Sequence, residues 1–280
     1  IKYGLDYFQK FEPLTVGDAL KRVPSATFQS DVLEYDGVRL RGLDPGYTQI
    51  MINGEKVPGS GVDRSFFVDR IPAELIERVE IVRSSSADRS GDALAGAINI
   101  VLRDAYSLDG GYVKAGGLYF DDDELKPTVG GVVGAPIGDA RILLGGNIQG
   151  RHNPKDKKSF RFEPDAGALA FDNREDQSDV RDGTDYSFNA SLVRPFLGGE
   201  IDISGLYVRT DRTETEHSFE YGDETSVDIG DLNETSDQFE DIFQENYTGR
   251  VKLTVPFLGG EALVRVGYAG FKDEIVATEL

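Results

Sequence analysis

Cysteine and tryptophan are absent from this chain of 280 residues, and histidine occurs only twice. Without cysteine the protein has neither a disulfide framework nor a thiolate metal site. We expect His152 and His217, which lie in polar segments, to be solvated loop residues. No nucleophile is paired with a base, and we interpret Asp88 and Asp92 around Arg89 as a loop salt bridge. The sequence therefore predicts no catalytic residue, no metal site and no cofactor, and the protein is not expected to be an enzyme.

Positive charge is scarce as well. The 30 Lys and Arg residues against 50 Asp and Glu residues give a net charge of −20, whereas nucleic-acid binding requires a basic face. No apolar run reaches the roughly 18 residues that a membrane-spanning helix needs. A transmembrane β-strand stays open, because it carries only an alternating pattern over about 10 residues. Residues 1–12 contain no signal peptide, so we interpret the chain as mature or trimmed.

The most informative stretch runs from Ile71 to Arg103 and reads IPAELIERVEIVRSSSADRSGDALAGAINIVLR. Pro72 suits the first turn of a helix, and the alternation from Val79 to Arg83 is typical of a half-buried strand. Small and polar residues follow over 84–96, and residues 97–102 are again mostly apolar. The stretch therefore predicts a helix, a strand, a loop and a second strand.

This stretch resembles the plug-domain signature of TonB-dependent outer-membrane receptors. The positions that agree with the family pattern are Ile76, Glu77, Arg78, Glu80, Ile81, Arg83, Ser86, Gly91, Ala93, Gly96, Ile98, Asn99 and Ile100. The departures change size and leave the pattern intact: Ser84 and Ser85 replace a Gly-Pro pair, Ser90 replaces an aromatic residue, and Ala95 replaces a glycine.

A second motif agrees with this resemblance. Residues 38–57, VRLRGLDPGYTQIMINGEKV, contain Arg41-Gly42, an apolar strand and Asn53-Gly54 in the order that the family shows. Asn-Gly between apolar runs is also a strong hairpin signal, because both residues tolerate positive φ. We therefore expect a strand over Thr48–Ile52 in the core sheet of the plug, followed by a tight turn.

The family's plug opens with a helix and a proline, and the segment VGDALKRVPS at residues 16–25 resembles this opening. Thr15 is the predicted cap of the helix, and Asp18 completes a capping box. In the family an energy-coupling box normally precedes this helix, and the sequence contains no convincing copy of it.

The resemblance also implies functional residues. In the family, the loop after the Asn-Gly hairpin points to the outer face and contacts the ligand; the corresponding ligand-binding candidates are Ser60, Asp63, Arg64, Phe66 and Phe67. The family's motif arginines lock the plug to glutamates of the barrel, a role implied for Arg41 and Arg83. A planar guanidinium can hold a carboxylate with two hydrogen bonds, which suits a partly desolvated lumen. The alternative for each residue is an ordinary surface position.

After residue 109 apolar and polar residues alternate, most clearly in DYSFNASL at 185–192 and YTGRVKLTV at 247–255. A soluble sandwich would give the same alternation. The sequence predicts seven strands, over 111–120, 126–135, 140–152, 184–195, 200–211, 246–256 and 261–272.

Three features favour a transmembrane barrel. Aromatic residues lie ten positions apart at the two ends of predicted strands, as in Tyr186 and Phe196. The tight turn PFLGGE occurs twice, and long polar connections are predicted over 151–183 and 210–245. Short turns at one end and long loops at the other are typical of outer-membrane barrels. The second connection holds thirteen acidic residues, and we favour a solvated loop over a cation site there.

The predicted fold is a mixed α+β plug domain over residues 1–105, followed by an antiparallel transmembrane β-barrel over residues 106–280, with about seven strands present. Closed single-chain barrels have an even number of strands from 8 upward, and a plug requires a wide lumen. We therefore expect the chain to be a fragment that contains the plug and the first third of the barrel.

The resemblance implies a TonB-dependent outer-membrane transporter that imports a scarce nutrient, such as an iron chelate, a siderophore or a carbohydrate, by plug rearrangement. The implied partners are the TonB protein of the inner-membrane energy-coupling complex, a small-molecule ligand such as a metal chelate or oligosaccharide, and outer-membrane lipid. The alternative is an outer-membrane receptor that binds a ligand and signals or adheres without transport. The expected location is the outer membrane of a Gram-negative cell, and the ligand is not identified by the sequence.

Overall fold

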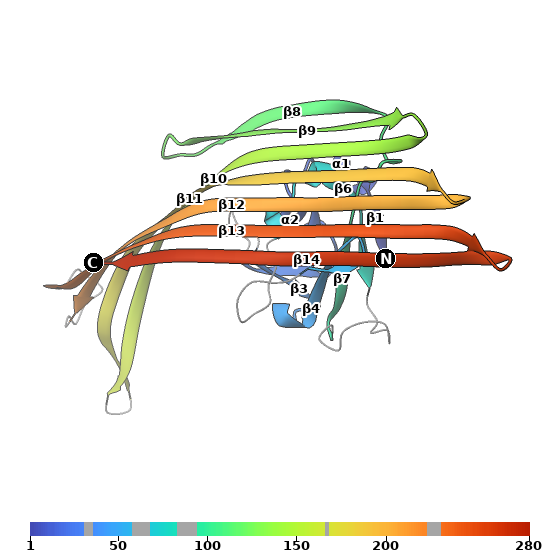
Figure 1. Ribbon diagram of the computed structural model, residues 1–280. Helices are drawn as coiled ribbons and strands as arrows, with labels where there is room; N and C mark the ends of the chain where they lie inside the picture. Colours follow the sequence, from blue (N-terminus) through green and yellow to red (C-terminus); the bar gives the residue numbers. More distant parts are fainter. Residues whose placement is uncertain (31–35, 58–67, 83–93, 166–167, 223–230) are drawn as a thin grey trace.

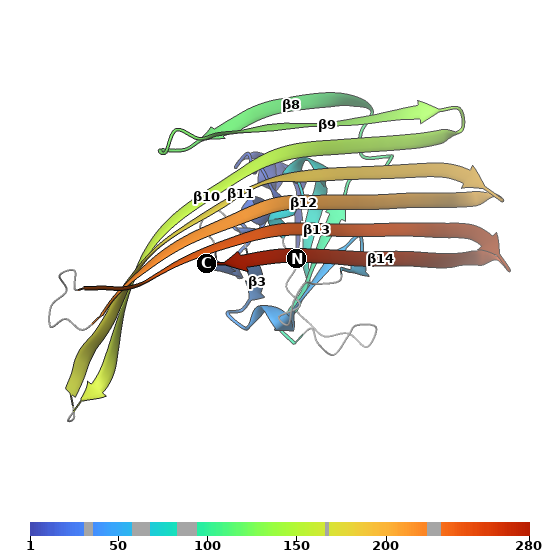
Figure 2. The ribbon, with the colours of Figure 1, turned by 60° about the vertical axis from the view of Figure 1, so that its left-hand side comes forward.

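The computed structural model describes residues 1–30, 36–57, 68–82, 94–165, 168–222 and 231–280. They form a five-stranded sheet near the N-terminus, a separate two-stranded sheet and a seven-stranded sheet in the rest of the chain. Figures 1 and 2 show the N-terminal elements gathered on one side of the large curved sheet. No helix in the described part of the chain is long and apolar enough to cross a bilayer.

The five-stranded sheet, called the plug sheet below, has the order β1-β6-β7-β4-β5. Its strands β4 and β7 are parallel, and its other neighbours are antiparallel. Strands β2 and β3 pair separately. The bounds are β1 (Lys2–Gly4), β2 (Ala26–Ser30), β3 (Asp36–Leu40), β4 (Thr48–Ile52), β5 (Glu55–Lys56), β6 (Ile76–Val82) and β7 (Gly96–Leu102).

Short helices and turns cover the plug sheet: α1 (Leu5–Gln9), α2 (Val16–Leu20) and the 3-10 turns η1 (Pro45–Tyr47), η2 (Val68–Arg70) and η3 (Ala73–Leu75). The predicted capping box is confirmed at α2. The Asp18 N–H donates to Thr15 Oγ1 at 3.2 Å, and the Thr15 N–H donates to Asp18 Oδ2 at 3.2 Å. These two bonds satisfy backbone donors that the first turn leaves open.

The helix predicted after Pro72 is wrong. Only the 3-10 turn η3 forms there, and strand β6 already begins at Ile76. The reason is that β6 pairs with β1 on one edge and β7 on the other, and its β-branched residues Ile76, Val79 and Ile81 are buried. Tertiary pairing therefore overrides the local helical pattern.

The seven-stranded sheet, called the wall below, has the order β14-β13-β12-β11-β10-β9-β8, with every neighbouring pair antiparallel. The number of strands agrees with the prediction. Their bounds are β8 (Gly110–Tyr119), β9 (Leu125–Ile137), β10 (Ala140–Asp165), β11 (Ala168–Phe196), β12 (Gly199–Gly222), β13 (Asp231–Phe257) and β14 (Gly260–Glu279).

The long polar connections predicted over 151–183 and 210–245 are wrong over most of their length. Strands β10 to β13 continue through them and reach 24 to 29 residues each. The ladder between the strands continues, and charged side chains form pairs across it, such as Arg161 with Glu220 at 3.3 Å and Arg181 with Glu214 at 3.5 Å. Polar residues therefore extend the strands beyond the apolar band.

The tight turns at the opposite end of the wall are present as predicted. Between β11 and β12, Leu197 and Gly198 have φ values of 50° and 78°, and between β13 and β14, Leu258 and Gly259 have φ values of 49° and 82°. Two successive positive φ values are characteristic of a two-residue hairpin turn. The wall thus has short turns at one end and long strand extensions at the other, as Figure 1 shows.

The burial of the wall residues is inverted relative to a soluble sandwich. Phe188 is 51% exposed and Val251 is 40% exposed, whereas Ser187, Asn189 and Ser191 are buried. The polar residues of the alternating pattern therefore face inward, and the apolar ones face outward. An outward apolar face with a polar interior is the arrangement of a transmembrane barrel.

Candidate functional site: the contact between plug sheet and wall

The β4–β5 turn is the point where the two predicted motifs meet. Asn53 and Gly54 have φ values of 52° and 84°, which confirms the predicted tight turn. Asn53 Oδ1 accepts a hydrogen bond from the Leu102 N–H at 2.8 Å, and the Gly54 N–H donates to Asn99 Oδ1 at 2.8 Å. Two asparagine side chains therefore tie this turn to strand β7.

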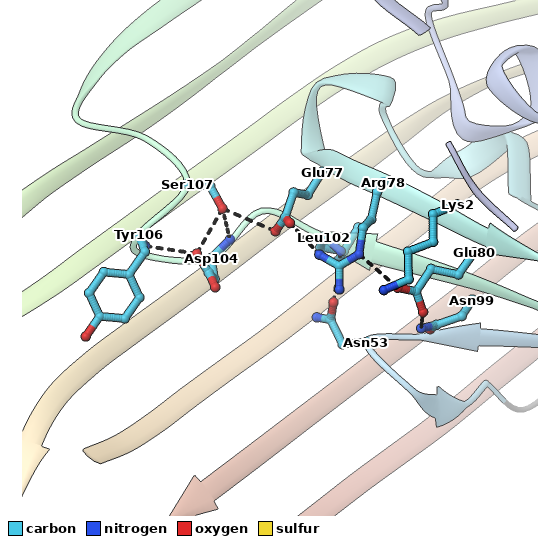
Figure 3. A network of polar contacts seen from close by, with 10 residues as sticks. All are labelled: Lys2, Asn53, Glu77, Arg78, Glu80, Asn99, Leu102, Asp104, Tyr106 and Ser107. Atoms are coloured by element: carbon cyan, nitrogen blue, oxygen red, sulfur yellow. Dashed lines mark hydrogen bonds and ion pairs between the residues drawn. The ribbon is translucent and has the colours of Figure 1, made fainter. Parts of the chain in front are cut away.

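Asn99 extends the network to strand β6, as Figure 3 shows. Its Nδ2 donates to Glu80 Oε2 at 3.1 Å, while Arg78 Nε donates to Glu80 Oε1 at 2.9 Å. Lys2 Nζ of β1 lies 3.3 Å from Glu80 Oε1. Burial raises the pKa of the Glu80 carboxyl, but hydrogen bonds from Arg78, Asn99 and Lys2 outweigh it and lower that pKa to about 2. Glu80 is therefore ionised at neutral pH and joins three strands.

The wall reaches this network through Arg250 of β13. Its Nη1 donates to the Asn53 carbonyl oxygen at 3.0 Å, and its Nη2 donates to Asp202 Oδ2 of β12 at 3.0 Å. The Arg250 and Asp202 side chains are only 17% and 14% exposed. Because few water molecules reach it, this charge-assisted pair is stronger than a surface ion pair.

A second polar contact lies further along the same wall strand. Arg70 of η2 is 5% exposed and donates through Nη1 to Gln244 Oε1 of β13. Beside it, Leu206 and Val208 of β12 belong to the hydrophobic core of the plug sheet. Strands β12 and β13 therefore hold the plug sheet by polar and apolar contacts together.

The segment between the two sheets is also fixed to the wall. The Ala105 N–H donates to Ser191 Oγ at 3.2 Å, and Arg141 Nε donates to the Ala105 carbonyl at 3.1 Å. Tyr106 OH donates to Glu200 Oε2 at 2.6 Å. These bonds tie the connecting segment to strands β10, β11 and β12.

This geometry agrees with comparisons to known proteins. Residues 4–97 match the family described as TonB-dependent Receptor Plug Domain. The alcaligin outer membrane receptor FauA from Bordetella pertussis aligns with a TM-score of 0.50 and 13% identity over 100% of this chain and 47% of that receptor. Residues 4–97 therefore form a TonB-dependent receptor plug domain, and the wall that follows has the fold of the barrel strands in such receptors. The fold of the chain is the predicted plug followed by an antiparallel barrel sheet.

Two further solved structures of low identity are similar. The siderophore receptor PirA from Acinetobacter baumannii aligns at a TM-score of 0.45 and 15% identity over 98% of this chain and 48% of that protein. The unliganded ferric citrate transporter FecA aligns at a TM-score of 0.41 and 13% identity over 99% of this chain and 60% of that protein. The chain thus spans about half the length of the receptors that it matches.

Membership of this family decides two of the predictions. TonB-dependent receptors lie in the outer membrane, which places this receptor there, and they are not enzymes. Among the residues that the structure describes, no three His, Asp or Glu side chains gather where they could hold a metal ion.

The predicted ligand-contacting residues lie outside the described part of the receptor; they are Ser60, Asp63, Arg64, Phe66 and Phe67. The same holds for Arg83. Arg41 is described: it lies exposed just after β3 with a φ of 59°, and its N–H donates to the Ser25 carbonyl at 3.3 Å. Its role in locking the plug stays a prediction.

The expectation of a solvated His152 is wrong. The side chain is buried: Nδ1 lies 2.8 Å from Asp182 Oδ1, and Nε2 lies 2.6 Å from Asp122 Oδ2. The His152 ring also contacts the edge of Phe120. The histidine therefore holds the β8–β9 hairpin against β10 and β11. His217 also lies in a strand, β12, but its side chain is half exposed.

Sequence reasoning missed two wall residues that contact the plug: Gln244, which accepts from Arg70, and Arg250, which donates to Asn53. The alternating pattern of β13 indicates that both face inward, since they share parity with the buried Asn246. Their partners are 174 and 197 residues away in sequence, and no local pattern identifies such a pair.

Proposed function

We propose that this receptor imports a scarce nutrient across the outer membrane by rearrangement of its plug, driven by the TonB protein. The observation that carries the proposal is a plug sheet seated on the polar inner face of a wall whose outer face is apolar. A folded plug in a barrel blocks free diffusion, so passage requires the plug to move. Polar plug–wall contacts such as Arg250 with Asn53 favour such movement, because water or lumen groups can replace them.

The ligand class is proposed from similarity to receptors of known ligand. Similar structures include the alcaligin receptor, the siderophore receptor PirA, a ferric enterobactin receptor in complex with enterobactin and the ferric citrate transporter. We therefore propose an iron chelate as ligand, with a carbohydrate or other chelate as the next class to test. The proposed ligand contacts are Ser60, Asp63, Arg64, Phe66 and Phe67, and Arg41 and Arg83 are proposed to lock the plug to barrel glutamates.

The proposed domain boundary falls between residues 105 and 106. Ala105 is buried against the wall, and strand β8 begins at Gly110. By the topology of outer-membrane barrels, the short turns face the periplasm and the strand extensions face the outside. Outer-membrane lipid is the proposed partner of the apolar outer face.

The test is uptake by cells that express the full-length receptor and lack other iron receptors. Radiolabelled ferric enterobactin, ferric citrate and ferric alcaligin are supplied with and without a functional tonB gene. Import that requires TonB supports the proposal. Binding without import, coupled to transcription of a reporter, would instead favour a signalling receptor. The absence of both for every chelate and for a panel of oligosaccharides would contradict the proposed function.

A further inference from the structure

A cavity of about 230 Å³ lies between the β4–β5 hairpin and the wall. On the plug side it is lined by Asn53, Glu55 and Lys56. On the wall side, strands β12, β13 and β14 line it with the larger Leu206, Thr248, Arg250 and Tyr268 and with five small residues, Ser204, Gly205, Gly249, Gly267 and Ala269. The small side chains leave this space unfilled, so the plug does not pack tightly against this part of the wall.

Two arginines of the wall contact the hairpin beside this cavity. Arg250 donates to the Asn53 carbonyl at 3.0 Å from a position that is largely shielded from solvent. Arg265 lies 3.8 Å from Glu55, and both side chains are well exposed, so this pair contributes little. Arg250 is therefore the stronger of the two contacts.

Resting on the transport function proposed above, we propose that Arg250 is the wall-side latch of the plug. Release of its bond to Asn53 opens the cavity beside it into the passage for the solute. The Asn53–Gly54 turn is joined to β7 through Asn99 and from there to Glu80 on β6. A displacement of the plug sheet is therefore transmitted to the turn that the latch holds.

The chemistry of the contact suits a reversible latch. The acceptor is a backbone carbonyl, so breaking the bond leaves no carboxylate without its counter-ion. Arg250 keeps its ion pair with Asp202 at 3.0 Å within the wall, and its charge stays compensated when the plug moves away. A direct plug–wall ion pair would leave two separated charges on release.

The test uses the full-length receptor in cells and exploits the lack of native cysteine in this chain. A single G267C substitution reports on the cavity, because a Cβ at Gly267 would lie 3.4 Å from Glu55 Cδ of the hairpin. The probe is a membrane-impermeant cationic thiosulfonate reagent. Adding R250A should raise the rate at which the G267C thiol is labelled by about tenfold, the effect of losing one charge-assisted hydrogen bond.

The matched control is R194A, which removes an exposed ion pair with Asp139 at the turn end of the wall. It should leave the labelling rate of the G267C thiol unchanged, and R250K should restore most of the protection. A second reporter, A105C, lies at a buried position on the connecting segment. The latch proposal is contradicted if R250A raises the labelling rate of A105C as much as that of G267C. It is also contradicted if R250A raises neither labelling rate. Labelling does not require transport, so this result stands even if uptake is absent.

The passage itself is tested by a disulfide between E55C and G267C, which pins the hairpin across the cavity. Uptake of radiolabelled ferric enterobactin should be abolished in oxidised cells and restored by a reductant. An A105C/S191C pair, which pins the connecting segment, should leave the uptake rate unchanged. Undiminished uptake with the first disulfide formed would overturn the passage, while uptake by the unmodified receptor would still support the proposed function.

Discussion

Asn99 and Glu80 lie side by side on strands β7 and β6, with 3.1 Å between Asn99 Nδ2 and Glu80 Oε2. The same Asn99 amide accepts a hydrogen bond from the Gly54 N–H. One buried amide thus connects an acidic residue of the signature strand to the turn of the second motif. Its two bonds explain why an amide, with a donor and an acceptor on one group, is needed at this position.

Replacement of Asn99 by leucine should destabilise the plug sheet. The variant leaves the Gly54 N–H and one Glu80 oxygen without their amide partner at a partly buried site, which is expected to cost about 1–2 kcal/mol of unfolding free energy. Amide hydrogen exchange of Gly54 and Leu102 in the full-length receptor measures the effect. The exposed Asn233 provides the control, since N233L should leave these rates unchanged. Unchanged exchange in N99L would show that the amide is dispensable.

Acidification should weaken the plug sheet through Glu80. The folded-state pKa of about 2 lies below the usual 4.5, so the carboxylate stabilises the fold above pH 4.5 and loses this contribution as the pH falls from 4.5 to 2. The contribution is on the order of 2 kcal/mol. Urea unfolding of the plug sheet in the full-length receptor is monitored by hydrogen exchange at several pH values. Over this pH range E80Q should lose less stability than the wild type. Parallel curves for both proteins would refute the assignment.

The Arg70–Gln244 contact should couple plug and wall energetically. R70A and Q244L each remove a buried charge-assisted hydrogen bond. Each is expected to lower the free energy that holds the plug against the wall by about 2 kcal/mol. Because both act on one contact, the double variant should cost less than the sum of the single ones. The rate at which a protease cleaves the plug in outer-membrane vesicles measures this free energy for the two single variants and the double variant. Strict additivity would mean that the two side chains do not interact.

An arginine on the outer face should destabilise the receptor where the wall faces the bilayer but not in the strand extensions. Phe188 lies outward within the apolar band of β11, and F188R is expected to cost about 2–4 kcal/mol of folding free energy. Phe219 is also exposed but lies in the polar extension of β12, where an arginine stays in water. Folding yield into phosphatidylcholine vesicles compares the two variants. Equal yields for F188R and F219R would contradict the placement of the bilayer.

Much of the fold follows from local sequence. The Thr15–Asp18 capping box, the Asn53-Gly54 turn and the two-residue turns of the wall are encoded within a few residues, because they depend on local dihedral preferences. The helix expected after Pro72 does not form, for the opposite reason. Its residues pair as strand β6 with β1 and β7, which lie elsewhere in the chain. The polar strand extensions were not predicted because the alternation of apolar and polar residues that indicates a strand is absent where both faces of the strand contact water.

The sequence alone determined the motifs of the plug, the number of wall strands and the parity of each strand, since these depend on neighbours within one element. The alternation by itself did not determine which parity is buried, because a sandwich and a membrane barrel share it. That was decided by the tertiary structure, in which the plug sheet covers the polar side of the wall. The contacts of Arg250 and Arg70 were decided there too, because they join residues that come together only when the plug sheet packs against β12 and β13.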